Sequence, residues 1–189
     1  MTISALDIQA SAALFRAGER LPEGLVVFLA SYLIWVFGAL MLLLLWKKRA
    51  AGHALLLLLA GAVLAYAINA ALHLAVFRAR PFVSLDVSAI INTAHLASSF
   101  PSDHAAVAFA LAAGYAFLDK KNAWLFLALA LAVSLGRVLA GVHFVGDVAM
   151  GALVGALAAG RVLRLRSLYN PQRFKLALDF RFKRDKQEQ

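Results

Sequence analysis

Two long stretches of the chain carry no charged residue. No charge interrupts the sequence between Glu23 and Lys47, or between Arg49 and Arg78. A bilayer core about 30 Å thick requires about 20 mostly apolar residues in a spanning helix, so both stretches predict transmembrane helices. Three further apolar stretches approach this length only if polar residues lie at one of their ends. They cover residues 101–119, 122–140 and 142–163.

This pattern predicts an all-α protein, a polytopic transmembrane bundle of five spans, or six if residues 3–17 insert partly. Residues 1–24 form an N-terminal segment that is expected at the periplasmic surface or interface. Residues 25–165 form the transmembrane domain and residues 166–189 a basic cytoplasmic tail. The spacing of Gly151 and Gly155 favours close packing of the last span within the bundle over a dimer contact.

The composition supports a membrane protein. Hydrophobic residues make up 63% of the 189 residues, charged residues 15%, and the mean hydropathy is +0.80. A soluble domain is near half apolar and a quarter charged, so an ordinary soluble domain, a disordered chain and a nucleic-acid binder are excluded. Because cysteine is absent, the chain has no disulfide, no thiolate nucleophile and no Cys-ligated zinc.

Basic residues orient the spans. Residues 161–189 hold nine Lys and Arg but three acids, and further basic clusters lie at residues 47–49 and 120–121. If the spans alternate, all three clusters face one side, which the positive-inside rule assigns to the cytoplasm. The tail would lie near anionic lipid. Residues 1–24, 77–102 and 136–147 then lie on the outer side.

Titratable residues from distant parts of the chain gather in these outer segments. Arginines and histidines together form a site for an anion, and phosphate fits them best. The residues are Arg78, Arg80, Asp103, His104, Arg137, His143 and Asp147. Charge at the end of a span is costly and usually functional. Arg80, which precedes Pro81, could instead simply extend to the interface.

Two motifs suggest how an anion could react. Ser102 occupies an N-cap position before an apolar helix, whose free N–H groups bind phosphate oxygens, and His104 could protonate a leaving oxygen. His143 and Asp147 lie four residues apart, hence on one helix face, where the carboxylate would fix the imidazole tautomer. Arg137 could clamp the phosphoryl oxygens. The alternatives are a capped helix with an incidental histidine and a buried His–Asp pair joining two helices.

These motifs resemble the type 2 phosphatidic acid phosphatase superfamily. Its pattern is Lys-x6-Arg-Pro, then Pro-Ser-Gly-His, then Ser-Arg-x5-His-x3-Asp, all in this order. This chain has Arg80-Pro81, then residues 101–104, then Arg137-x5-His143-x3-Asp147. Three positions depart from the pattern. His73 replaces the lysine, Asp103 the glycine and Gly136 the first serine; Arg78 could bind phosphate in place of that lysine.

The sequence of residues 100–105 resembles that of the bacterial undecaprenyl-diphosphatase branch of this superfamily. The resemblance implies a helical core like that of acid phosphatases and haloperoxidases. It implies an inner-membrane enzyme, with its site at the periplasm, that recycles the lipid carrier of peptidoglycan synthesis and is associated with bacitracin resistance. The implied substrate is a polyprenyl diphosphate, and the other expected partners are membrane lipids. The resemblance implies no cofactor, no metal ion and no nucleic-acid partner. The oligomeric state is left open.

The resemblance also implies roles for individual residues. His143 would attack phosphorus, Asp147 would orient it, and His104 would protonate the leaving lipid phosphate and then activate water. The phosphoryl oxygens would be held by Arg80, Arg137, Ser102 and the Asp103–His104 backbone. His53 is expected to be structural, while His95 could help in binding.

Other functions remain compatible with these residues. The lipid could be phosphatidylglycerophosphate, phosphatidate or the lipid A 1-phosphate, and the enzyme could pass the phosphoryl group to another acceptor. A non-catalytic lipid transporter with an anion site is a third possibility. The spacing of Arg137, His143 and Asp147 favours catalysis, because transport alone does not require it.

Overall fold

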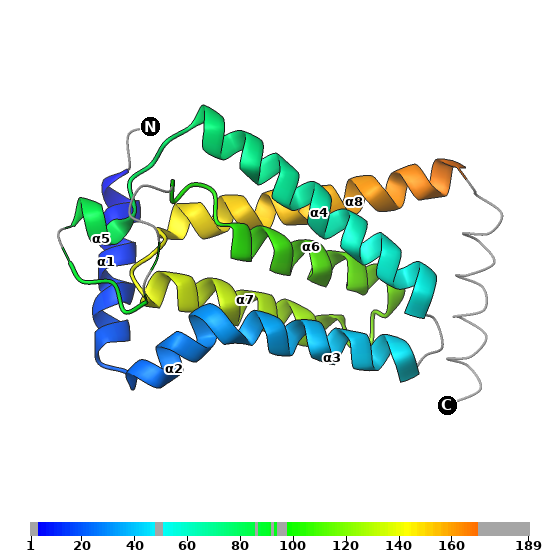
Figure 1. Cartoon of the computed structure of the whole chain (residues 1–189), viewed down its shortest axis with the longest axis horizontal. Coiled ribbons are helices and arrows are strands. Elements are labelled where there is room, and N and C mark those ends of the chain that lie inside the picture. The colour runs from blue at the N-terminus through cyan, green and yellow to red at the C-terminus, as the bar shows by residue number, and fades with distance from the viewer. Residues whose placement is uncertain (1–3, 48–50, 86, 92, 94–97, 170–189) are drawn as a thin grey trace.

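The apolar stretches form helices in the computed structural model, which describes residues 4–47, 51–85, 87–91, 93 and 98–169. No strand occurs within these ranges. The elements are α1 (Ala5–Glu19), α2 (Glu23–Val27), the π-helical η1 (Phe28–Tyr32), α3 (Leu33–Lys47), α4 (Ala51–Ala75), α5 (Pro81–Ser84), α6 (Asp103–Leu118), α7 (Ala123–Leu139) and α8 (Val145–Tyr169). Figure 1 shows the long helices running side by side.

Three helical segments in the described part of the chain are long and apolar enough to cross a membrane: Glu23–Lys47, Gly52–Ala75 and Val145–Arg166. The first joins α2, η1 and α3 without a break. The helices α6 and α7 have 16 and 17 residues, which at 1.5 Å per residue is about 24–26 Å. The predicted all-helical transmembrane bundle is confirmed, but α6 and α7 are shorter than the three long helical segments.

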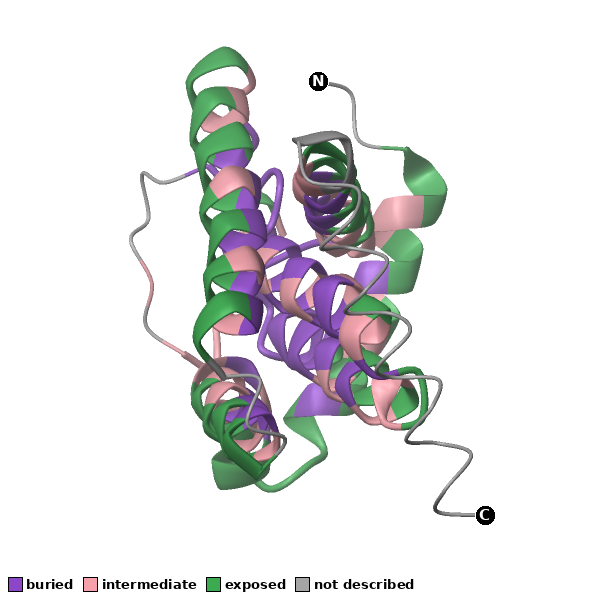
Figure 2. Ribbon diagram, turned by 90° about the vertical axis from the view of Figure 1, so that its right-hand side faces the viewer, coloured by how far each residue is buried: buried purple, intermediate pink, exposed green. Residues whose placement is uncertain are grey.

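The helix α6 forms the centre of the bundle, where it packs against α8, α4 and α7. Its buried face consists almost entirely of small residues. They are Ala105, Ala106, Ala108, Ala110, Ala112 and Gly114, followed by Tyr115. Figure 2 shows buried residues along the inner faces of the helices and exposed residues outside. Small residues let helix backbones approach closely, which is how helices associate in a lipid environment.

The contact between α6 and α8 depends on two glycines. A Cβ atom on Gly151 would lie 2.5 Å from the Ser102 carbonyl oxygen, and one on Gly155 would lie 2.8 Å from the Ala110 nitrogen. Neither position has room for a side chain unless the helices separate. The predicted packing of these glycines within the bundle is therefore confirmed.

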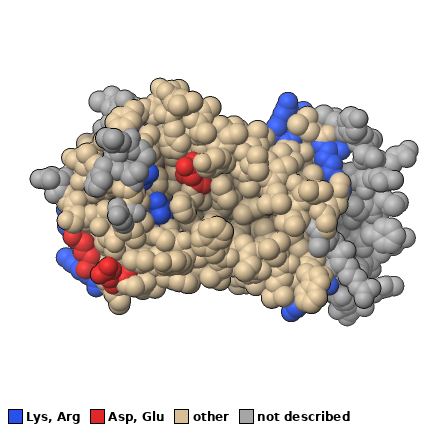
Figure 3. Space-filling view, viewed as in Figure 1, with Lys and Arg blue, Asp and Glu red and all other residues tan. Residues whose placement is uncertain are grey.

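Large apolar side chains cover the outside of the bundle. Leu74 is 92% exposed and Trp35 is 75% exposed, which suits a surface in contact with lipid tails. Figure 3 shows most charged side chains toward the two ends of the molecule, with a broad uncharged band between them. Most of the predicted cytoplasmic tail, residues 170–189, lies outside the described residues.

The N-terminal helix α1 lies across one end of the bundle (Figure 1). It packs against α7 and α8. Gly18 lies against the backbone of Leu139, and the Phe15 ring lies under Gly141, where a Cβ would approach it to 2.7 Å. Gly141 has a φ of 72°, a conformation that glycine adopts without steric cost. This glycine allows the chain to turn sharply between α7 and α8.

We expect Gly155→Val to lower the thermal unfolding temperature of the detergent-solubilised protein. Overpacking of a close helix contact costs about 1–3 kcal/mol. Gly160→Val on the same helix is the matched control, because nothing lies within 4 Å of a Cβ at Gly160. Equal destabilisation of the two variants would show that the α6–α8 contact tolerates a side chain.

Candidate active site

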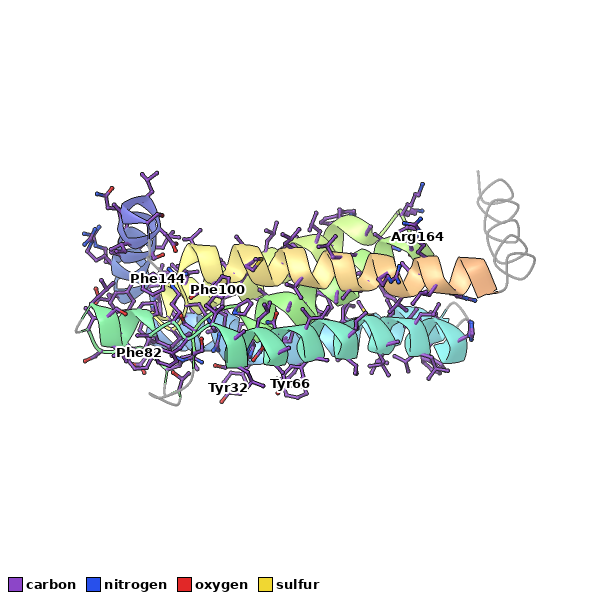
Figure 4. The ribbon with its side chains drawn as sticks, turned by 90° about the horizontal axis from the view of Figure 1, so that it is seen from above. Tyr32, Tyr66, Phe82, Phe100, Phe144 and Arg164 are labelled. Atoms are coloured by element: carbon purple, nitrogen blue, oxygen red, sulfur yellow. The ribbon has the colours of Figure 1, made fainter. Side chains whose placement is uncertain are left out.

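The fold brings the three polar motifs together at the end of the bundle where α1 lies. Backbone hydrogen bonds join them directly: Ser99 N donates to Arg78 O at 2.8 Å, and Ser102 N donates to Asp147 O at 3.0 Å. Figure 4 shows Phe82, Phe100 and Phe144, one from each motif region, at this same end, with Arg164 toward the opposite one. The convergence expected from alternating spans is therefore present.

The two histidines and two arginines of the motifs form one electrostatic cluster. His104 interacts with Arg137, His143, Asp103 and Arg80. His143 in turn interacts with Arg137, Arg80 and Asp147. The side chains come from the α4–α5 connection, the first turn of α6, the end of α7 and the turn before α8.

His143 lies in the turn that precedes α8, and not on the helix itself. Its Nδ1 is 2.8 Å from the Ser99 carbonyl oxygen and 3.8 Å from Asp147 Oδ2. A carbonyl oxygen can only accept, so Nδ1 must carry the proton and Nε2 keeps its lone pair. The hydrogen bond that the sequence analysis assigns to Asp147 thus goes to Ser99, while Asp147 lies close enough to stabilise a positive imidazole.

The surroundings of His143 favour its neutral form. The side chain is 4% exposed, and burial lowers the pKa of His143 below that of an exposed histidine; Asp147 opposes this shift, while Arg137 and Arg80 reinforce it. A neutral imidazole with an unprotonated Nε2 is a nucleophile at neutral pH. The arrangement is therefore suited to attack on an electrophilic centre held by the two arginines.

Arg78 binds two carboxylates. Its Nη1 lies 2.5 Å from Asp147 Oδ1 and its Nη2 lies 2.5 Å from Asp7 Oδ2. The guanidinium carbon also lies 4.2 Å from the centroid of the Phe144 ring. From the sequence, Arg78 was expected to bind phosphate in place of the lysine. This geometry favours a different role, because both of its terminal nitrogens already hold acidic side chains.

Arg80 and Arg137 have no such partners among the described residues. Arg80 Nη1 donates to the Val142 carbonyl at 3.0 Å, and Arg137 Nη1 donates to the Ala30 carbonyl at 3.1 Å. The buried Nε atom of each lacks a hydrogen-bond partner, and no ion pair to either guanidinium occurs within the described part of the chain. Buried charge without a counter-ion is strongly unfavourable. Two adjacent guanidinium groups without ion-pair partners among the described residues are therefore suited to bind an anion.

The start of α6 has the predicted N-cap. Ser102 is fully buried, and its Oγ accepts a hydrogen bond from Ala105 N at 3.5 Å. Among the described residues the Ser102 hydroxyl has no acceptor, so its proton can be donated to a bound group. His104 lies in the first turn beside Arg137 and His143. This location suits proton transfer to a group bound between the arginines.

Two of the departures from the family pattern contact each other. Asp103 Oδ1 lies 3.3 Å from His73 Nε2 and accepts a hydrogen bond from Asn69 Nδ2 at 3.0 Å. The residue in place of the lysine therefore pairs with the residue in place of the glycine. A carboxylate is thus added beside the anion site, where Asp103 interacts with both Arg80 and Arg137.

Four residues in or beside the site escape sequence reasoning. Ser99 acts through its carbonyl oxygen, which no side-chain pattern reveals, and Asn69 lies fully buried in α4. Asp7 and Ser11 lie four residues apart on α1, a spacing that could have indicated one polar face.

His53 is exposed near the start of α4, whereas His95 lies outside the described residues. The described residues contain no group of three or more side chains that could hold a metal ion.

Comparison with known proteins decides the family. The model of the PAP2 superfamily matches residues 54–170, which is more than half of the chain. This chain belongs to the PAP2 superfamily. The predicted resemblance to a family of membrane lipid phosphatases is thereby confirmed.

Two curated relatives of this PAP2 protein come from bacilli. The chain is 34% identical over 167 residues to the bacitracin transport permease protein BcrC of Bacillus licheniformis, covering 84% of this chain and 80% of the relative. It is 33% identical over 141 residues to the undecaprenyl-diphosphatase BcrC of Bacillus subtilis (strain 168), covering 73% of this chain and 71% of the relative.

A solved structure, that of Aquifex aeolicus LpxE, is similar to this PAP2 protein. It superposes with a TM-score of 0.72 at 25% sequence identity, covering 87% of this chain and 99% of LpxE. The similarity includes more of the chain than the family match does. The acid-phosphatase-like helical core that the resemblance implies is thus supported by both sequence and fold.

We expect Asp103→Asn to bind orthovanadate about 3- to 10-fold more tightly than the unaltered protein. Removal of one negative charge beside Arg80 and Arg137 lowers the repulsion of an anion, by about 1 kcal/mol at a partly exposed site. Binding is measured by titration calorimetry. Asp119→Asn, the same change at the far end of α6, is the control; weaker binding by Asp103→Asn would show that Asp103 assists the anion.

Proposed function

We propose that this protein hydrolyses undecaprenyl diphosphate to undecaprenyl phosphate and inorganic phosphate through a phosphohistidine intermediate. One observation carries the proposal: His143 has a free Nε2 beside two guanidinium groups, of Arg80 and Arg137, that lack counter-ions among the described residues. Positioning and charge stabilisation are most of what phosphoryl transfer needs.

The first step forms the phosphoenzyme. Nε2 of His143 attacks the terminal phosphorus, and the bond from that phosphorus to the bridging oxygen breaks. The negative charge of the bound diphosphate favours the protonated form of His104, and this imidazolium donates its proton to the departing undecaprenyl phosphate. Arg80, Arg137, Ser102 and the N–H groups at the start of α6 hold the phosphoryl oxygens, while Asp147 stabilises the positive charge that develops on the imidazole.

The second step releases phosphate. His104, now neutral, takes a proton from a water molecule that attacks the phosphohistidine. The phosphorus–nitrogen bond breaks, inorganic phosphate leaves, and His143 returns to its starting tautomer with the proton on Nδ1 held by Ser99. The arginines supply the positive charge, so the reaction as proposed does not require a divalent cation.

A lipid diphosphate fits the position of the site. The polar cluster lies at one end of a bundle whose sides expose large apolar residues, so a substrate could keep its hydrocarbon tail in the bilayer with its headgroup at the interface. The name of the Bacillus subtilis relative supports the undecaprenyl chain. The Lys and Arg bias of the sequence supports a location in the bacterial inner membrane with the site at the periplasmic face.

Two other functions have some support. Another lipid phosphate, such as phosphatidylglycerophosphate, phosphatidate or the lipid A 1-phosphate, would fit the same reacting groups. The name of the Bacillus licheniformis relative points to transport. The orientation of His143 by a main-chain carbonyl favours catalysis, because a carrier needs an anion site but no nucleophile.

The test is the release of inorganic phosphate from undecaprenyl diphosphate by the purified protein in detergent. We expect His143→Ala to lower turnover by roughly 1,000-fold or more, because the nucleophile is removed. His53→Ala, at an exposed histidine near the start of α4, should leave turnover unchanged. Undiminished turnover in His143→Ala would rule out the proposed nucleophile.

Two additional arms of this assay separate the alternatives. A panel of the other lipid phosphates is compared at equal concentration, and faster release from any of them would replace the proposed substrate. Addition of a metal chelator should leave the rate unchanged. A protein that binds the lipid without releasing phosphate would favour the transport function.

A further inference from the structure

We infer that Asp7, on the N-terminal helix, is a positioning residue of this phosphatase site. It holds Arg78 and the first turn of α8 together, and thereby fixes Asp147 and His143. The inference rests on the proposed function. Asp7 lies outside residues 54–170, the part of the chain that matches the PAP2 superfamily, so the family match does not assign this residue a role.

The first link is a chain of ion pairs. Arg78 is 6% exposed and lies between Asp7 Oδ2 and Asp147 Oδ1, each at 2.5 Å. The Asp7 side chain is 15% exposed and that of Asp147 is fully buried. A buried guanidinium that loses one of two carboxylates keeps an uncompensated charge. Asp7 therefore determines where Arg78 rests, and Arg78 determines where Asp147 rests.

The second link is a cap supplied by a different helix. The first N–H groups of a helix have no partner within that helix. At α8 two of them are taken by α1: Gly146 N donates to Asp7 Oδ1 at 2.9 Å, and Val145 N donates to Ser11 Oγ at 2.9 Å. Asp147 Oδ2 accepts from Phe144 N at 2.8 Å. The turn that carries His143 thus ends at a helix start fixed by α1.

The packing leaves the Asp7 carboxylate little freedom. A Cβ on Gly146 would lie 2.8 Å from Asp7 Oδ2 and 3.5 Å from Arg78 Nη1, so the glycine allows the carboxylate to lie against the backbone of α8. Further along α1, Phe15 lies under the turn at Gly141 and Gly18 lies against the Leu139 backbone. These contacts hold α1 in the register that places Asp7 at Arg78.

The geometry predicts which kinetic parameter changes. The contacts of Asp7 go to Arg78, Gly146, Ser11 and its own N-cap Ser4, while the unmatched arginines that would bind the phosphate, Arg80 and Arg137, are separate from them. Removal of the Asp7 charge should therefore misplace the nucleophile and leave substrate binding unchanged. A lid formed by α1 would have the opposite effect, on KM.

The first experiment compares Asp7→Asn with the unaltered protein in phosphate release from undecaprenyl diphosphate. Asparagine can still accept the hydrogen bond from Gly146, but it cannot form the ion pair. We expect kcat to fall about 10-fold with KM within twofold, and Asp7→Glu to restore part of the activity. Glu19→Gln, an exposed acid on the same helix, is the control and should change neither parameter.

A double-variant cycle tests whether Asp7 acts through Arg78. Asp7→Asn combined with Arg78→Gln should have the kcat of Arg78→Gln alone, because the link is already broken. A kcat lowered by the product of the two single effects would overturn the inference. If Asp7→Asn gives too little folded protein, the kcat of the double variant is compared with that of Arg78→Gln, because the double variant removes both charges together. Equal kcat values support the inference, and a lower kcat of the double variant overturns it.

The outcomes separate this inference from the proposed function. Absence of phosphate release by the unaltered protein overturns both. Release by the unaltered protein and equal kcat in Asp7→Asn overturns only the role of Asp7. A lower unfolding temperature with unchanged kcat per folded molecule also overturns it, because α1 would then be a structural brace alone.

Discussion

A guanidinium group removed from water is costly unless its charge is matched, and two carboxylates match the charge of Arg78. Asp147 and Asp7 each approach it to 2.5 Å, and the Phe144 ring lies against its face. The three charged residues come from the α4–α5 connection, the start of α8 and the N-terminal helix, so this one cation joins three parts of the bundle. The position of Asp147, and through it the turn that carries His143, depends on this match.

Arg80 and Arg137 show the contrast that defines the site. Both donate to backbone carbonyls, yet neither is paired with a carboxylate within the described residues. A matched guanidinium supports structure, whereas adjacent unmatched ones attract an anion. The bundle makes this possible because small residues on α6 and glycines on α8 bring the helices close enough to hold the polar ends of three segments together.

Much of the architecture could be predicted from the sequence. The charge-free stretches indicated the long helices, and the order of the three motifs indicated their convergence at one end and the family. The stretches at residues 101–119 and 122–140 reached spanning length only with their polar ends, and the helices α6 and α7 that they form are short, with 16 and 17 residues. The N-cap at Ser102 followed from its position before an apolar run and is confirmed.

The partners of individual side chains could not be predicted. A spacing of four residues placed His143 and Asp147 on one helix face, but the sharp turn at Gly141 puts the histidine before the helix, where a main-chain carbonyl of Ser99 accepts its Nδ1 proton. The roles of Arg78 and Asp7 depend on contacts between residues far apart in the chain. Spacing carries no information about such contacts when no second motif points to them.

The central claim is that a neutral His143 attacks phosphorus, and trapping the phosphoenzyme tests it most directly. Undecaprenyl diphosphate radiolabelled on its terminal phosphorus is mixed with the protein, quenched rapidly in alkali and digested. We expect label on the peptide that contains His143, stable in alkali and released in acid, as for a phosphohistidine. Label on another residue, or phosphate release at full rate with no labelled peptide at any quench time, would contradict the account.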